Sequence, residues 1–251
     1  MSANHSSAAA VEAELAALAD PERARSSAPY VGVVPGGNGE GDVLLGIPVP
    51  AQRKVARLHR DADVAELETL LASEVHEHRL TALVVLTLQF ERADPERRQR
   101  LADFYLAHRD QVNNWDLVDA SAPRLLADRV RAAPRELLDP LLASASLWDR
   151  RIAMLATFPL IREGEFAETL RCAEALLGDG EDLIQKAVGW MLREVGKRDE
   201  AVLRGFLDRH AAQMPRTMLR YSIERLPASK RKRYMGARAR AQTMNGAELS
   251  A

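Results

Sequence analysis

Cysteine is almost absent from this sequence, since Cys172 is the single example among 251 residues. This scarcity excludes a disulfide framework and a zinc site of the CxxC type. Cys172 stands in an amphipathic pattern, FAETLRCAEALL, that favours a buried and inert thiol. Long apolar runs are also lacking, and none approaches the ~18 residues that a membrane-spanning helix needs. The first residues lack the basic start and apolar stretch of a signal peptide, so we expect a cytoplasmic protein with no membrane partner.

Aromatic residues are scarce as well, at 5% of the chain, and only three of them are tryptophans. Apolar residues nevertheless make up 47%, which excludes a disordered chain. The length suits one large domain or a short array of repeats with a real core.

The chain as a whole has almost no net charge, but two of its parts carry large net charges of opposite sign. Residues 182–240 hold 15 Lys or Arg against 6 Asp or Glu, a net of +9, and the rest of the chain carries a net of −10. Such asymmetry favours contact between the basic part and a polyanion. The alternative is a solvated basic face beside a flexible basic tail.

Helix signals dominate the chain after Pro50. Proline or an Asp-Pro pair stands at the expected helix starts near Pro50, Asp94, Pro134 and Pro215. Residues 29–50 contain six of the 14 glycines and form the only long loop we expect. We expect residues 1–12 to be disordered, 13–236 to form a single HEAT-like repeat domain, and 237–251 to form a flexible tail.

Five segments resemble variants of one helical unit, and their starts lie 35, 33, 37 and 32 residues apart. They begin at His78, Asn113, Ser146, Leu183 and Pro215. A second amphipathic helix fills most of the gaps, and two helices per repeat of this length predict an all-α solenoid of HEAT-like repeats. A plain helical bundle is the alternative.

Stacked helix pairs curve and present a concave surface lined by the first helix of each pair. These segments are rich in cations, so the predicted groove is basic and suits the phosphates of duplex DNA. The candidate DNA-binding side chains are Arg79, Arg150, Arg151, Lys186, Arg193, Arg216 and Arg220. The basic stretch 230–233 would extend this surface.

Trp115 and Asp119 are four residues apart in NNWDLVD, which places an indole and a carboxylate on one face of a helix. Arg151 and Trp190 belong to neighbouring repeats, so the four residues could form a small site. The alternative is that each tryptophan belongs to the core, which is also our interpretation of Trp148.

These segments resemble the AlkD-like DNA alkylation-repair glycosylases from about Tyr30 to Tyr234. The similarity is carried by GEGDVLLGIPVPAQRK, NNWDLVD, LWDRRIAMLATF, IQKAVGWMLREVGKRD and MPRTMLRYSIERL. The resemblance implies a superhelix of HEAT-like repeats that holds duplex DNA. It also implies excision of cationic N3- or N7-alkylated purines without base flipping.

The resemblance further implies roles for individual residues. Asp119 corresponds to the catalytic carboxylate, Trp115 and Trp190 to the flanking aromatics, and Arg151 to an arginine near the lesion. Tyr30 is expected to line the same end of the groove as a DNA contact. In one family member a glutamine stands where this chain has Pro48, which argues against a lesion contact from that loop.

The expected enzyme acts as a monomer on duplex DNA with alkylated purines, without a metal, a cofactor or an obligate protein partner. Two alternatives remain open: a DNA-structure-binding relative without activity, and a protein-binding helical scaffold. Asp116 is interpreted as a capping or structural acid. His76 and His78 are two apart on a helix and face different ways, which disfavours a metal site. The glycine-rich residues 35–42 have the spacing of neither a Walker loop nor a calcium loop.

Overall fold

The computed structural model describes residues 7–239, and this part of the chain is all-α. It contains sixteen α-helices and one 3-10 turn, and its only β-pairing is an isolated parallel bridge between Val43 and Val75. The predicted all-α helical-repeat class is therefore confirmed. No helix within the described range combines the length and the apolar character needed to cross a membrane.

The chain divides into two compact units, Met1–Arg129 and Val130–Ala251, which are described one at a time. The single domain expected over 13–236 stays a prediction. Residues 8–12, for which we expected disorder, belong to the first helix. They are ordered because Val11 and Leu15 are buried and Ser7 caps the helix. Residues 237–239, expected to belong to a flexible tail, are helical. Residues 1–6 and 240–251 of the expected irregular ends lie outside the described residues.

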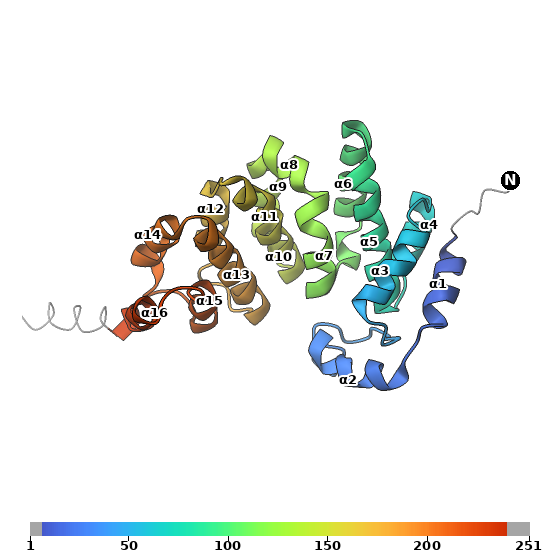
Figure 1. Cartoon of the computed structure of the whole chain (residues 1–251), viewed down its shortest axis with the longest axis horizontal. Coiled ribbons are helices and arrows are strands. Elements are labelled where there is room, and N and C mark those ends of the chain that lie inside the picture. The colour runs from blue at the N-terminus through green and yellow to red at the C-terminus, as the bar shows by residue number, and fades with distance from the viewer. Residues whose placement is uncertain (1–6, 240–251) are drawn as a thin grey trace, which may run out of the picture. The chain divides into compact units, whose positions relative to one another are not determined.

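The first unit is built around one long buried helix, α5, which packs against α1, α3, α4, α6 and α7 (Figure 1). Leu80, Leu83 and Leu86 of α5 are buried almost completely. The elements of this unit are α1 (Ala8–Ala16), α2 (Pro21–Val31), α3 (Val49–Leu58), α4 (Val64–Leu71), α5 (His76–Arg92), α6 (Pro95–Ala107), the 3-10 turn (Arg109–Gln111) and α7 (Trp115–Leu125). A short helix, α8 (Ala127–Ala132), contains the boundary between the units.

The second unit has α13 at its centre, in contact with α10, α11, α12, α14 and α15. Gly189 lets α13 and α15 approach closely, because a Cβ atom there would lie 2.6 Å from the Met218 carbonyl oxygen. The elements are α9 (Pro134–Leu142), α10 (Leu147–Ala156), α11 (Phe158–Glu163), α12 (Ala167–Ala175), α13 (Asp182–Arg198), α14 (Glu200–His210), α15 (Arg216–Ser222) and α16 (Ala228–Met235).

The repeat unit seen in the sequence corresponds to real helices. Helices α5, α7, α10, α13 and α15 begin within two residues of the five expected starts. Within the first unit α5 packs on α7, and within the second α10 packs on α13 and α13 on α15, as expected for the first helices of stacked pairs.

The loop expected from residue 29 starts later, at Gly32. Helix α2 continues through Pro29 and ends where Gly32 adopts a φ of 75°. Pro29 is tolerated because it stands in the last turn, where the missing N–H removes a single helical hydrogen bond. The loop then runs to Pro48, the N-cap of α3.

Candidate active site

A cleft of about 550 Å³ opens in the first unit, lined by α2, the loop before α3, and helices α3, α5 and α7. Three of the predicted site residues, Tyr30, Trp115 and Asp119, line it. Pro48 of the loop before α3 lines it too. The structure therefore brings part of the predicted site together within one unit.

Asn114 determines where α7 begins and so where Trp115 and Asp119 lie. Its side-chain oxygen accepts a hydrogen bond from the Trp115 amide at 2.8 Å, and its Nδ2 donates to the Val31 carbonyl at 2.8 Å. The second bond joins the start of α7 to the end of α2. Asp119 follows one helical turn later, half-buried on the same side of the helix as the indole.

Tyr30, near the end of α2, packs edge-to-face against Trp115. The ring centroids are 5.4 Å apart and the ring planes form an angle of 88°. Tyr30 remains 76% exposed despite this contact. An aromatic pair with one open face is suited to contact with a flat or cationic group.

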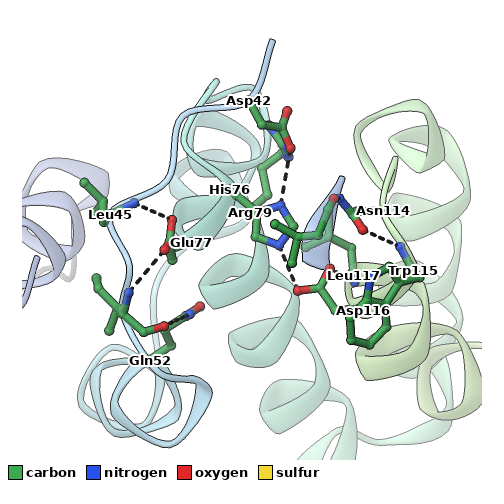
Figure 2. A network of polar contacts seen from close by, with 12 residues as sticks. Asp42, Leu45, Gln52, His76, Glu77, Arg79, Asn114, Trp115, Asp116 and Leu117 are labelled. Carbon is green, nitrogen blue, oxygen red and sulfur yellow. Dashed lines mark hydrogen bonds and ion pairs between the residues drawn. The ribbon is translucent and has the colours of Figure 1, made fainter. Parts of the chain in front are cut away.

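The loop beside the cleft is anchored by Glu77, a buried acid in the first turn of α5 (Figure 2). Its carboxylate accepts hydrogen bonds from three backbone amides, those of Leu45 at 3.0 Å, Gly46 at 2.7 Å and Ile47 at 3.2 Å. Gln52 of α3 donates to the Ile47 carbonyl at 2.7 Å. These bonds satisfy backbone groups that would otherwise be buried without partners, so the loop wall of the cleft is fixed.

Gly46 is required at its position in this loop. Its φ is 79°, and a Cβ atom there would lie 2.2 Å from the Asp20 carbonyl oxygen. Asp20 also donates its amide to the Leu45 carbonyl at 2.8 Å, which joins the start of α2 to the loop.

His76, the first residue of α5, lies between two carboxylates (Figure 2). Its Nε2 is 2.8 Å from Asp116 of α7, and its Nδ1 is 3.3 Å from Asp42 of the loop. Arg79, one turn along α5, donates to the same Asp42 oxygen at 2.5 Å and to the Ser73 carbonyl at 2.8 Å. His76 thereby connects the loop to the first turn of α7.

The surroundings of His76 favour its charged form. A carboxylate can only accept hydrogen bonds, so both ring nitrogens must carry a proton to donate to Asp42 and Asp116. Burial lowers the pKa of His76, but the hydrogen bonds to Asp116 and Asp42 outweigh it and raise the pKa to about 9. For Asp42, burial raises the pKa, but His76 and Arg79 together bring it below its usual value.

Arg23 of α2 and Arg53 of α3 are exposed and line the same cleft. They were not among the predicted contacts, because those were sought on the first helix of each expected repeat. Their placement gives this cleft two exposed positive groups beside the half-buried carboxylate of Asp119.

Trp190 and Arg151 belong to the second unit. Trp190 is half-buried on α13, donates from Nε1 to Glu194 at 3.1 Å, and lies 6.2 Å from the Phe158 ring centroid. Arg151 is only 4% exposed, and its Nη1 donates to the Leu183 carbonyl at 2.6 Å. Their expected roles beside a lesion stay predictions.

Among the other cations selected as DNA contacts, Arg79 is buried in the first unit and binds Asp42. The remaining ones lie in the second unit, and three of them have acidic partners. Arg150 pairs with Asp179 at 2.7 Å, Lys186 with Asp182 at 2.6 Å, and Arg193 with Glu224. Arg216, which donates to the Met235 carbonyl at 3.1 Å, and Arg220 are exposed. Within the stretch 230–233, Lys230 pairs with Glu200 and Arg233 with Asp208.

The polar network of His76, Asp42 and Asp116 was not predicted from the sequence, where the HEH motif was weighed only as a metal site. In the described part of the chain no group of three or more His, Cys, Asp or Glu could hold a metal ion. One signal in the sequence could have indicated the network. The segment VHEHRL puts several charged or polar residues at the start of an otherwise apolar helix, and such side chains need hydrogen-bond partners when they are buried.

Comparison with known proteins places the chain in a family. A family model described as DNA alkylation repair enzyme matches residues 11–226. A solved structure described as a predicted DNA alkylation repair enzyme from Enterococcus faecalis matches with a TM-score of 0.64 and 18% identity, covering 84% of this chain and 97% of that chain. No curated protein matches the chain. The family model supports a role in alkylation repair, with the DNA binding that this role implies, and the chain belongs to the DNA alkylation repair enzyme family.

Proposed function

We propose that the protein is a DNA glycosylase that hydrolyses the N-glycosidic bond of cationic N3- or N7-alkylated purines in duplex DNA. The observation that carries this proposal is the placement of Asp119 beside Trp115 in one cleft, with the exposed Tyr30 against the indole. Family membership supports damaged DNA as the substrate, and the residues of the cleft support the chemistry.

The chemistry starts from the charge of the damaged base. Alkylation at N3 or N7 makes the purine cationic, so it leaves with the bonding electron pair as a neutral base and needs no strong acid. Bond breaking leaves an oxocarbenium-like sugar, as in other glycoside hydrolysis. The Asp119 carboxylate stabilises this cation, orients a water toward C1′ and accepts its proton.

The aromatic residues act on the same charges. An indole or phenol face attracts a nearby cation by ~0.5–2 kcal/mol. Trp115 and Tyr30 therefore favour the cationic base, and they favour the developing sugar cation as well. The benefit is greatest for charged lesions, so the site discriminates against undamaged purines, which are neutral.

The exposed cations place the DNA backbone. Arg23 and Arg53 line the cleft, where they can contact phosphates on either side of the lesion. We further propose that the lesion stays within the duplex, as the family resemblance implies. The expected roles of Arg151 and Trp190 rest on that resemblance alone.

The experiment is base release from methylated duplex DNA. The native protein should release free 7-methylguanine or 3-methyladenine, measured by chromatography, and Asp119→Asn should release far less while still binding the duplex. Asp61→Asn is the matched control, because this side chain is 84% exposed and lies outside the cleft. No release by the native protein, with DNA still bound, would refute the proposal and favour a DNA-structure-binding protein without activity.

A further inference from the structure

The polar network at the start of α5 joins elements that are distant in sequence. His76 is separated from Asp42 by 34 residues and from Asp116 by 40. Asp42 belongs to the loop that lines the cleft through Leu44, Gly46 and Ile47. Asp116 follows Trp115 in the first turn of α7. His76 itself lines the cleft and is 3% exposed.

We propose that His76 is a positioning residue: as an imidazolium it fastens the first turn of α7 to the loop, and so fixes Trp115 and Asp119 for the reaction. This inference rests on the proposed function for the roles of those two residues. His76 acts through Asp116 and does not itself touch the reacting atoms.

Only the charged form of the imidazole makes both bonds. A neutral ring carries one N–H, so either Asp42 or Asp116 would lose its hydrogen bond from His76, and that poorly solvated carboxylate would face a lone pair of the ring. The side chains of Asp42 and Asp116 are 7% and 16% exposed, so water replaces the lost donor poorly. Loss of the proton therefore loosens the connection between the loop and α7.

The other charged groups near His76 do not replace it. Arg79 donates to Asp42 and to a backbone carbonyl. Glu77 is engaged by the amides of the loop. Arg53 of α3 and Asp119 of α7 line the same cleft. Asp116 also accepts a bond from the Leu117 amide, which orders the helix start but does not reach the loop.

The connection should appear in the pH dependence of catalysis. With a pKa of about 9, His76 is charged at neutral pH and loses its proton in the alkaline range. The single-turnover rate of base release should fall with that loss, after subtraction of the protein-free reaction. DNA affinity should change by less than about threefold, because the proposed phosphate contacts, Arg23 and Arg53, are not bonded to His76.

The test compares the native protein with His76→Gln, Asp116→Asn and His78→Gln between pH 6 and 10. His76→Gln should release base at least tenfold more slowly at pH 7 and show no alkaline decrease from this group. Asp116→Asn, which keeps the side-chain shape, should move the midpoint to lower pH. His78→Gln is the matched control, a buried histidine of the same helix turned toward Ser73, and should keep the native profile.

A second readout does not depend on activity. Protein labelled with 5-fluorotryptophan gives a fluorine NMR signal for Trp115, assigned with Trp115→Phe, and this signal should titrate with the same midpoint in the native protein and not in His76→Gln. The inference would be overturned if the rate of base release by His76→Gln still fell at alkaline pH as in the native protein. It would also be overturned if the Trp115 signal of the native protein did not titrate. If the native protein releases no base, the proposed function fails, and the Trp115 titration alone decides whether His76 positions α7; Asp116→Asn provides the test if His76→Gln does not fold.

Discussion

Replacing His76 should change how the stability of the first unit depends on pH. The pKa of His76 rises from 6.5 to about 9 on folding, because its bonds to Asp116 and Asp42 outweigh the effect of burial. A group with a raised pKa in the folded state stabilises that state fully below its unfolded pKa. This contribution decreases as the pH rises from about 6.5 and is gone above about 9.

The size of the effect follows from the shift. At ~1.4 kcal/mol per pKa unit, protonated His76 contributes about 3 kcal/mol to the free energy of unfolding. The conversion suits this residue, since its side chain is only 4% exposed. That contribution is a large part of the stability of an ordinary domain.

The assay is urea denaturation at several pH values between 6 and 10, for the native sequence and for His76→Gln. Trp115 fluorescence follows the first unit in a background where Trp148 and Trp190 are phenylalanine. The native free energy of unfolding should fall by about 3 kcal/mol more than that of His76→Gln across this range. Parallel curves for the two proteins would refute the assignment of His76 as a buried imidazolium.

Three further outcomes follow from the structure. Gly46→Ala should lower the free energy of unfolding, measured by thermal denaturation, by about 2 kcal/mol or more, because the new Cβ would collide with a carbonyl oxygen. At Gly36 a new Cβ meets no atom within 4 Å, so Gly36→Ala should lower it by about 1 kcal/mol in the same assay. Trp115→Leu should slow base release about tenfold by loss of its cation contact, with Trp148→Leu as the control for losing a tryptophan outside the cleft. The thiol of Cys172 should react with a thiol reagent only after unfolding, because burial raises its pKa to about 12.

The helical repeats were predictable because their signals are local. Asp94 caps α6 by accepting the Arg97 amide, as expected for Asp before Pro95 at a helix start. The four-residue spacing of Trp115 and Asp119 correctly placed both on the cleft side of α7. Such features depend on residues within one or two helical turns of each other.

The interior of the site was not predictable in the same way. The partners of His76 are 34 and 40 residues away, and no local pattern indicates which carboxylate will face a buried imidazole. Glu77 was unassigned for the same reason, since its partners are backbone amides of a distant loop. Such pairings depend on the tertiary packing of the loop against α5.

Net charge also says little about which cations are available to DNA. The segment 182–240 carries a net of +9, yet Lys186 and Arg193 both pair with acids of the same segment. Arg23 and Arg53 lie in the part of the chain with net negative charge and nevertheless line the cleft. Local placement decides which cations can meet a phosphate.

The most direct test of the central claim is the single-turnover rate of 7-methylguanine release from a duplex with one lesion, compared between the native protein and Asp119→Asn. A carboxylate that stabilises the sugar cation and orients water predicts a loss of about a hundredfold or more, with duplex binding retained. Release by Asp119→Asn at the native rate would contradict the role of this carboxylate and the mechanism built on it.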